Sequence, residues 1–145
     1  MRYIFLDFDG VLVPLESPSK KARPAEAEPR CMAQLNRIVA ETDAKIVLTT
    51  SWSLFNSAEA LGRVLNRWGF LGDVIGAVPK EPYTRGAKVL AWLAANPGVE
   101  SFVAIDDEEL DMEEVAHNLV VTNPMFGLGK VTATMAIDLL LRNHS

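Results

Sequence analysis

The fold is decided near the N-terminus by residues 3–12, which read YIFLDFDGVL. An unbroken apolar run precedes Asp7, a pattern typical of a strand buried on both faces. Side chains alternate along a strand, so Asp7 and Asp9 can point to one side while Phe8 points to the other. Gly10 permits a sharp turn and lets a ligand approach the backbone. The stretch therefore predicts a buried strand that ends in two neighbouring carboxylates.

Short apolar runs alternate with helical patterns along the rest of the chain. Strands are predicted at residues 45–48, 102–105 and 119–121, and at 74–78 with Gly76 weighing against it; helices are predicted at residues 30–41, 61–68, 84–95 and 131–142. This alternation favours an α/β fold, a Rossmann-like three-layer sandwich with a mainly parallel central sheet, in a single domain of residues 1–145. Residues 14–29 hold four prolines and predict a loop or flap.

The net charge of −5 comes from one segment of the chain. Seven acidic residues lie between Asp106 and Glu114, more than the whole net charge. For Glu108 to Glu114 we expect a solvated helix face. Outside this segment no basic stripe is visible, so strong independent binding to nucleic acid is not expected.

Cysteine usage and hydropathy favour a cytoplasmic protein. Cys31 is the single cysteine, which excludes an intramolecular disulfide and a Cys/His zinc site, and we expect it in the core. The N-terminus does not resemble a signal peptide, and the apolar runs are far shorter than the roughly 20 residues of a membrane span. His117 and His144 are expected at the surface.

Residues 7–12 closely resemble motif one of the haloacid dehalogenase-like (HAD) superfamily, Asp-x-Asp-Gly followed by apolar residues. Residues 45–51, KIVLTTS, resemble motif two, a buried strand that ends in Ser or Thr. We assign the motif position to Thr49, with Thr50 as a near rival.

Two later stretches follow in the order of the superfamily. Arg85 at the start of a helix resembles motif three, for which Lys80 and Lys88 compete. Residues 104–107, AIDD, resemble motif four, either through the pair Asp106 and Asp107 or through acids four residues apart, Asp107 and Asp111. Several short strings, TTSW at residues 49–52 among them, are similar to a group of small HAD domains named after their occurrence in "Swiss army knife" RNA repair proteins.

The resemblance implies a Mg²⁺-dependent phosphohydrolase that works through an aspartyl-phosphate. Asp7 would be the nucleophile, and Asp9 the general acid and base. The implied metal ligands are Asp7, Asp9 through its backbone carbonyl, Asp106 and Asp107, and either of the last two could be the direct ligand. The implied phosphate-binding residues are Gly10, Thr49, Thr50 and Arg85.

A cap domain would have to lie between Gly10 and the helix near Arg30, or between Thr50 and Arg85. Both segments are too short for one, so we expect an open, capless site. Such a site would admit a bulky phosphorylated substrate, for example a nucleic-acid end or a phosphoprotein, with a small metabolite as the alternative. Lys20, Lys21 and Arg23 on the flap are candidates for contact with an anionic substrate. Two other classes stay open: a phosphorelay receiver-like domain, and a non-catalytic binding protein with a HAD fold.

Overall fold

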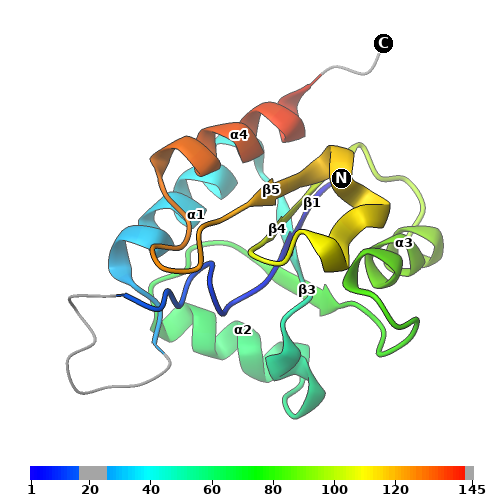
Figure 1. Ribbon diagram of the computed structural model, residues 1–145, viewed down its shortest axis with the longest axis horizontal. Coiled ribbons are helices and arrows are strands. Elements are labelled where there is room, and N and C mark those ends of the chain that lie inside the picture. Colours follow the sequence, from blue (N-terminus) through cyan, green and yellow to red (C-terminus); the bar gives the residue numbers. More distant parts are fainter. Residues whose placement is uncertain (17–25, 143–145) are drawn as a thin grey trace.

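The computed structural model describes residues 1–16 and 26–142, and in them a five-stranded sheet forms the centre of the molecule (Figure 1). All neighbouring strands are parallel, in the order β3-β2-β1-β4-β5. The strands are β1 (Arg2–Leu6), β2 (Lys45–Leu48), β3 (Val74–Ala77), β4 (Ser101–Asp106) and β5 (Leu119–Val121). The predicted α/β fold with a parallel sheet is confirmed.

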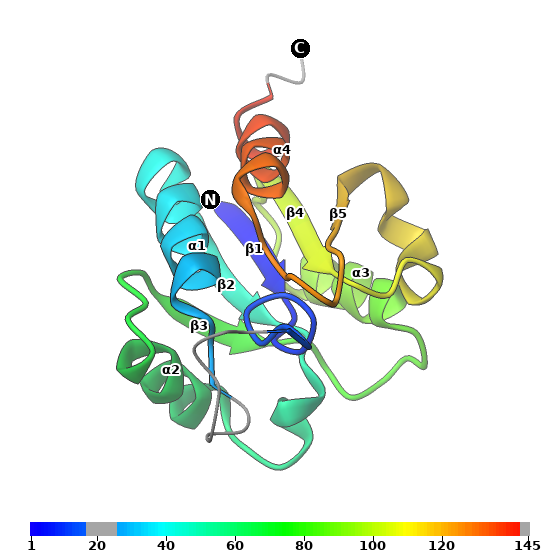
Figure 2. The ribbon, with the colours of Figure 1, turned by 60° about the vertical axis from the view of Figure 1, so that its left-hand side comes forward.

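Helices cover both faces of the sheet. They are α1 (Pro29–Thr42), α2 (Ala58–Arg67), α3 (Arg85–Ala95) and α4 (Lys130–Leu141), with two 3₁₀ helices, η1 (Ser51–Leu54) and η2 (Leu110–Asn118). One core holds Ile4 and Leu6 of β1 with apolar side chains of α1, α2 and α4. The other holds Tyr3 and Phe5 with α3 and η2. Figure 2 shows the sheet between α1 and α4 on one side and α3 on the other.

The central strand β1 brings the predicted motifs together. It pairs with β2 on one side and with β4 on the other, and Leu6 lies level with both Leu48 and Ile105. The residues that follow these partners are Asp7, Thr49 and Asp106. Because carboxyl ends of parallel strands meet at one edge, the three side chains share the edge where ligands bind in such sheets.

The candidate strand at residues 74–78 is confirmed as β3 despite Gly76: this edge strand pairs with β2, and the ring of Trp92 packs where a side chain at position 76 would lie. The expectation for residues 108–114 needs correction. The stretch after Asp107 is a 3₁₀ helix rather than a solvated helix face alone. Its Met112 and Val115 are buried in the second core, although most of its acids are exposed.

Other expectations are confirmed or fall outside the described residues. Cys31 is buried in the core and His117 is exposed. Most of the flap at residues 14–29, with Lys20, Lys21 and Arg23, lies outside the described residues, as does His144. Between η1 and α3 the chain adds only α2 and β3, so within residues 1–16 and 26–142 no cap domain covers the carboxyl edge of the sheet. None of the described helices is both long and apolar enough to cross a membrane.

Candidate active site

Three carboxylates converge at the ends of β1 and β4. Asp7, Asp106 and Asp107 each offer an oxygen atom, and these atoms lie within 4.8 Å of one another. Asp7 and Asp106 are buried, and Asp107 is half-buried. Backbone amides fix two of them: Phe8 N–H donates to Asp7 Oδ1 at 2.8 Å, and Glu108 N–H donates to Asp106 Oδ1 at 2.9 Å. Asp107 joins the group, whereas the rival acid Asp111 does not.

Burial of these carboxylates makes their ionisation costly. Desolvation, reinforced by the charge of Asp106, raises the pKa of Asp7 to about 8. Desolvation likewise raises the pKa of Asp106 to about 6, against the opposing effect of Arg85. A buried acidic cluster of this kind is stabilised by a positive charge placed among its oxygens.

Arg85 supplies part of that charge from the first residue of α3. Its Nη1 donates to Asp7 Oδ2 at 3.2 Å and to Asp106 Oδ2 at 2.9 Å, and its Nε lies 3.7 Å from Asp111 Oδ2. Thr84 caps the helix by accepting from Ala87 N–H at 3.2 Å. The motif-three candidate therefore contacts the carboxylate cluster directly.

Thr49 and Thr50 follow β2 but differ in their contacts. Thr50 Oγ1 accepts from Trp52 N–H and caps η1. Thr49 Oγ1 is buried and lacks a hydrogen-bond partner among the described residues. A buried hydroxyl without a partner carries an energetic cost of about 1–3 kcal/mol, which a bound anion would relieve. Thr49 therefore fits the motif-two position better than Thr50.

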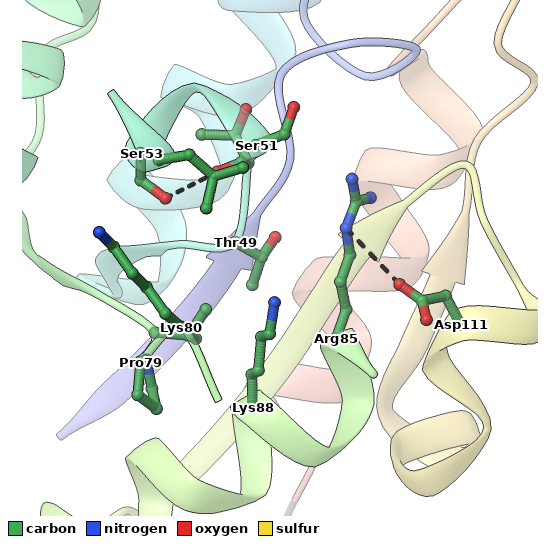
Figure 3. A pocket seen from close by; sticks show the side chains of 11 residues that line it. Thr49, Ser51, Ser53, Pro79, Lys80, Arg85, Lys88 and Asp111 are labelled. Carbon is green, nitrogen blue, oxygen red and sulfur yellow. Dashed lines mark hydrogen bonds and ion pairs between the residues drawn. The ribbon is translucent and has the colours of Figure 1, made fainter. Parts of the chain in front are cut away.

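A pocket of about 180 Å³ lies beside Thr49 (Figure 3). Its lining residues are Thr49, Thr50, Ser51, Ser53, Leu54, Val78, Pro79, Lys80, Arg85, Lys88 and Asp111. Figure 3 shows Lys88 extending from α3 toward Thr49, with Lys80 on the other side of the pocket. The three motif-three candidates thus line one pocket, and the chemistry of its lining suits a phosphoryl group.

Gly10 is required by the carboxylate cluster. Its φ of +80° suits glycine, and a Cβ at this position would collide with the carboxylate of Asp107. Thr122, at the end of β5, donates from Oγ1 to the Gly10 carbonyl at 2.8 Å and is itself buried. Thr122 was not among the predicted site residues, because nothing in its local sequence pattern distinguishes a residue that supports the turn from an ordinary strand end.

Asp9 is exposed, and its side chain lies outside the carboxylate cluster. Its Oδ2 accepts a hydrogen bond from Trp52 Nε1–H at 2.9 Å. It lines a second hollow of about 340 Å³, formed by Asp9, Gly10, Val13, Pro14, Leu15, Asp107 and Pro124. Leu15 N–H donates to the Pro124 carbonyl at 2.9 Å, which ties the start of the flap to the loop after β5.

The carboxylate cluster fits a hard divalent cation. Mg²⁺ prefers carboxylate oxygens and retains several waters, so few protein ligands suffice. Asp7, Asp106 and Asp107 supply three such oxygens, and the first two are buried with raised pKa values that a cation would reverse. The donor set contains oxygen alone, without the His or Cys ligands that zinc favours.

Comparison with known proteins assigns the chain to a family. No curated protein and no solved structure match it. The family model described as "HAD domain in Swiss Army Knife RNA repair proteins" matches residues 3–133, which include all the site residues discussed above. The chain therefore belongs to the family of HAD domains found in Swiss Army Knife RNA repair proteins.

Proposed function

We propose that the protein is a Mg²⁺-dependent phosphomonoesterase that forms an aspartyl-phosphate on Asp7. The observation that carries the proposal is the position of Asp7, whose carboxylate lies in one cluster with those of Asp106 and Asp107. Thr49 follows the neighbouring strand, and its buried hydroxyl lacks a hydrogen-bond partner among the described residues. Family membership supports a hydrolase of the HAD type. Bound at Asp7, Asp106 and Asp107, Mg²⁺ would offset the repulsion between carboxylate and phosphate and act as a Lewis acid.

The residues of the chain divide the reaction into two steps. In the first, an oxygen of Asp7 bonds to phosphorus, the ester P–O bond breaks, and Asp9 gives its proton to the leaving oxygen. In the second, a water oxygen bonds to phosphorus, its proton passes to Asp9, and the bond between Asp7 and phosphorus breaks. Asp9 regains in the second step the proton that it gave up in the first, and the bond that Asp7 formed to phosphorus is broken again. Both carboxyl groups therefore end in their starting state.

Three cationic groups and a hydroxyl suit the phosphoryl oxygens. The Thr49 hydroxyl can donate to one of them without losing an existing partner among the described residues. Lys88 and Lys80 line the same pocket, and Arg85 lies between this pocket and the carboxylates. Preorganised positive charge of this kind lowers the energy of a transition state whose charge is spread over the phosphoryl oxygens.

The open edge of the sheet supports a bulky substrate. The pocket of about 180 Å³ beside Thr49, which we propose as the phosphoryl pocket, and the hollow beside Asp9 both open at this edge. Within the described residues no cap domain covers the edge. Among bulky substrates we favour a phosphorylated nucleic-acid end over a phosphoprotein, because the family is named for RNA repair proteins. A 5′- or 3′-phosphorylated oligoribonucleotide should then be a better substrate than a phosphopeptide of similar charge.

The decisive experiment measures hydrolysis of p-nitrophenyl phosphate with and without Mg²⁺ by the parent protein and by Asp7→Asn. We expect turnover that EDTA abolishes and that the variant lacks, although it stays folded. A parental rate in Asp7→Asn would refute the nucleophile. A stable phosphoprotein without turnover would instead favour a receiver-like domain, and absence of both would favour a binding protein.

A further inference from the structure

The indole of Trp52 is fixed in place beside the carboxylate of Asp9. Trp52 is half-buried in η1, whose first turn is capped by Thr50. Its ring contacts Phe8 at 5.2 Å and Trp68 at 5.6 Å between centroids, both edge to face. Phe8 and Trp68 contact each other at 5.6 Å, which closes a cluster of three rings. Such a cluster leaves the indole little freedom to rotate.

Phe8 links this cluster to the reacting carboxylates. It lies between Asp7 and Asp9 in the chain and is buried, and its carbonyl accepts from the N–H groups of Val11, Leu12 and Val13. The turn that carries Asp9 is therefore anchored to the same ring against which Trp52 packs. The hydrogen bond of 2.9 Å from Trp52 Nε1 to Asp9 Oδ2 joins two parts of one rigid unit.

An acid and base at Asp9 needs a carboxyl group that stays off the cation and faces the ester oxygen. Asp9 lies only two residues from Asp7, yet its side chain is not part of the cluster of Asp7, Asp106 and Asp107. The indole N–H is a donor that neither accepts nor releases a proton under ordinary conditions. It can hold Oδ2 while leaving Oδ1 to exchange the proton.

We propose that Trp52 is a positioning residue of the reaction, which holds Asp9 away from the metal ligands and toward the leaving group. This inference rests on the proposed function and adds a residue that acts through Asp9 alone. The same short segment then serves the site three times: Thr49 faces the phosphoryl pocket, Thr50 caps η1, and Trp52 orients Asp9.

The test compares Trp52→Phe with Trp68→Phe, the same chemical change within the same ring cluster. Asp9 gains negative charge as it gives its proton to the leaving oxygen, and the loss of a hydrogen bond to such a group predicts a fall of about 10- to 100-fold in kcat/KM for a nucleoside monophosphate with Trp52→Phe. With p-nitrophenyl phosphate, whose leaving group needs little protonation, kcat/KM should change much less. The aspartyl-phosphate formed from it should nevertheless decay more slowly, because the second step also needs Asp9. Trp68→Phe should show neither effect.

Coupling to Asp9 distinguishes positioning from a general loss of structure. In an Asp9→Asn background, Trp52→Phe should cause no further loss of activity. Asp9 is exposed, so Asp9→Asn should keep the fold. In the ¹H–¹⁵N NMR spectrum of this variant, the indole N–H resonance of Trp52 should shift, while those of Trp68 and Trp92 should not. This measurement needs no change at Trp52 itself.

The outcomes separate this inference from the proposed function. An active parent whose Trp52→Phe variant behaves like Trp68→Phe, or an unchanged Trp52 resonance in Asp9→Asn, would overturn the role of Trp52 and leave the phosphatase standing. A parent without Mg²⁺-dependent turnover would overturn both.

Discussion

Replacing Asp7 by Asn should stabilise the cation-free protein increasingly as the pH rises. Asp7 is only 2% exposed, and its burial beside Asp106 raises its pKa from 3.8 to about 8. Between these values the folded protein keeps a proton on Asp7 that the unfolded chain has released. The free energy of unfolding of the parent therefore falls across this window. Asn stays neutral throughout, so the variant escapes this loss.

The size of the effect follows from the width of the window. One proton held over one pH unit is worth about 1.4 kcal/mol. From about pH 5 to about pH 7.5, Asp7 alone would cost the parent at most about 3.4 kcal/mol. Relaxation of the site and entry of water reduce this figure, so we expect the difference between variant and parent to grow by about 1–3 kcal/mol.

Urea unfolding of both proteins in EDTA at the two pH values measures this change. Asp106 titrates in part of the same window and is present in both proteins, but its charge acts on Asp7, so the measured difference includes the coupling between the two carboxylates. Repeating the series with Mg²⁺ provides the control: the cation should stabilise the parent more than the variant, and more at the higher pH. A difference that is constant with pH, or that shrinks as pH rises, would refute the account of Asp7 as a buried carboxylate awaiting a cation.

Three further substitutions test the proposed phosphoryl pocket and the proposed cation site. Thr49→Val should leave the free energy of unfolding unchanged or raise it, because the lost hydroxyl has no partner among the described residues. The same variant should lower kcat/KM for an aryl phosphate by about 10- to 100-fold. Thr50→Val removes the cap of η1 and should instead lower the free energy of unfolding by about 1 kcal/mol in the same urea experiment. Arg85→Ala should lower the free energy of unfolding in EDTA by about 2–4 kcal/mol, because buried Asp106 loses the guanidinium that pairs with it. Mg²⁺ should restore part of this loss. An equal loss with and without Mg²⁺ would contradict the proposal that the cation binds the carboxylates that Arg85 contacts.

The parts of the site that follow strands directly could be predicted from the sequence. Asp7, Thr49 and Asp106 each come directly after a buried apolar run, and parallel strands bring such positions to one edge. Their apolar runs also predict the central strands of the sheet. β3 is harder to predict because Gly76 lowers strand propensity, but pairing with β2 and packing of Trp92 outweigh that preference.

Contacts made across the fold could not be predicted in this way. Trp52 reaches Asp9 across 43 positions of the chain, and Thr122 reaches Gly10 across 112. Neither contact leaves a periodic pattern, because each depends on how a turn at one strand end is oriented against another. The choice of Asp107 over Asp111 as the third carboxylate likewise depends on the 3₁₀ geometry of η2, which brings Asp111 to Arg85 instead.

The position of Asp7, the proposed nucleophile, follows from the order of the strands. The proposed reaction needs a carboxylate that faces a cation and a phosphoryl group at once. β1 lies between β2 and β4, so the residue after it has Thr49 and the phosphoryl pocket on one side and the acids after β4 on the other. A nucleophile after β2 or β4 would lie next to one of these and a strand away from the other. Moving the Asp-x-Asp-Gly motif from β1 to another strand of this sheet should therefore separate cation and phosphate chemistry, even if every residue type of the site were kept.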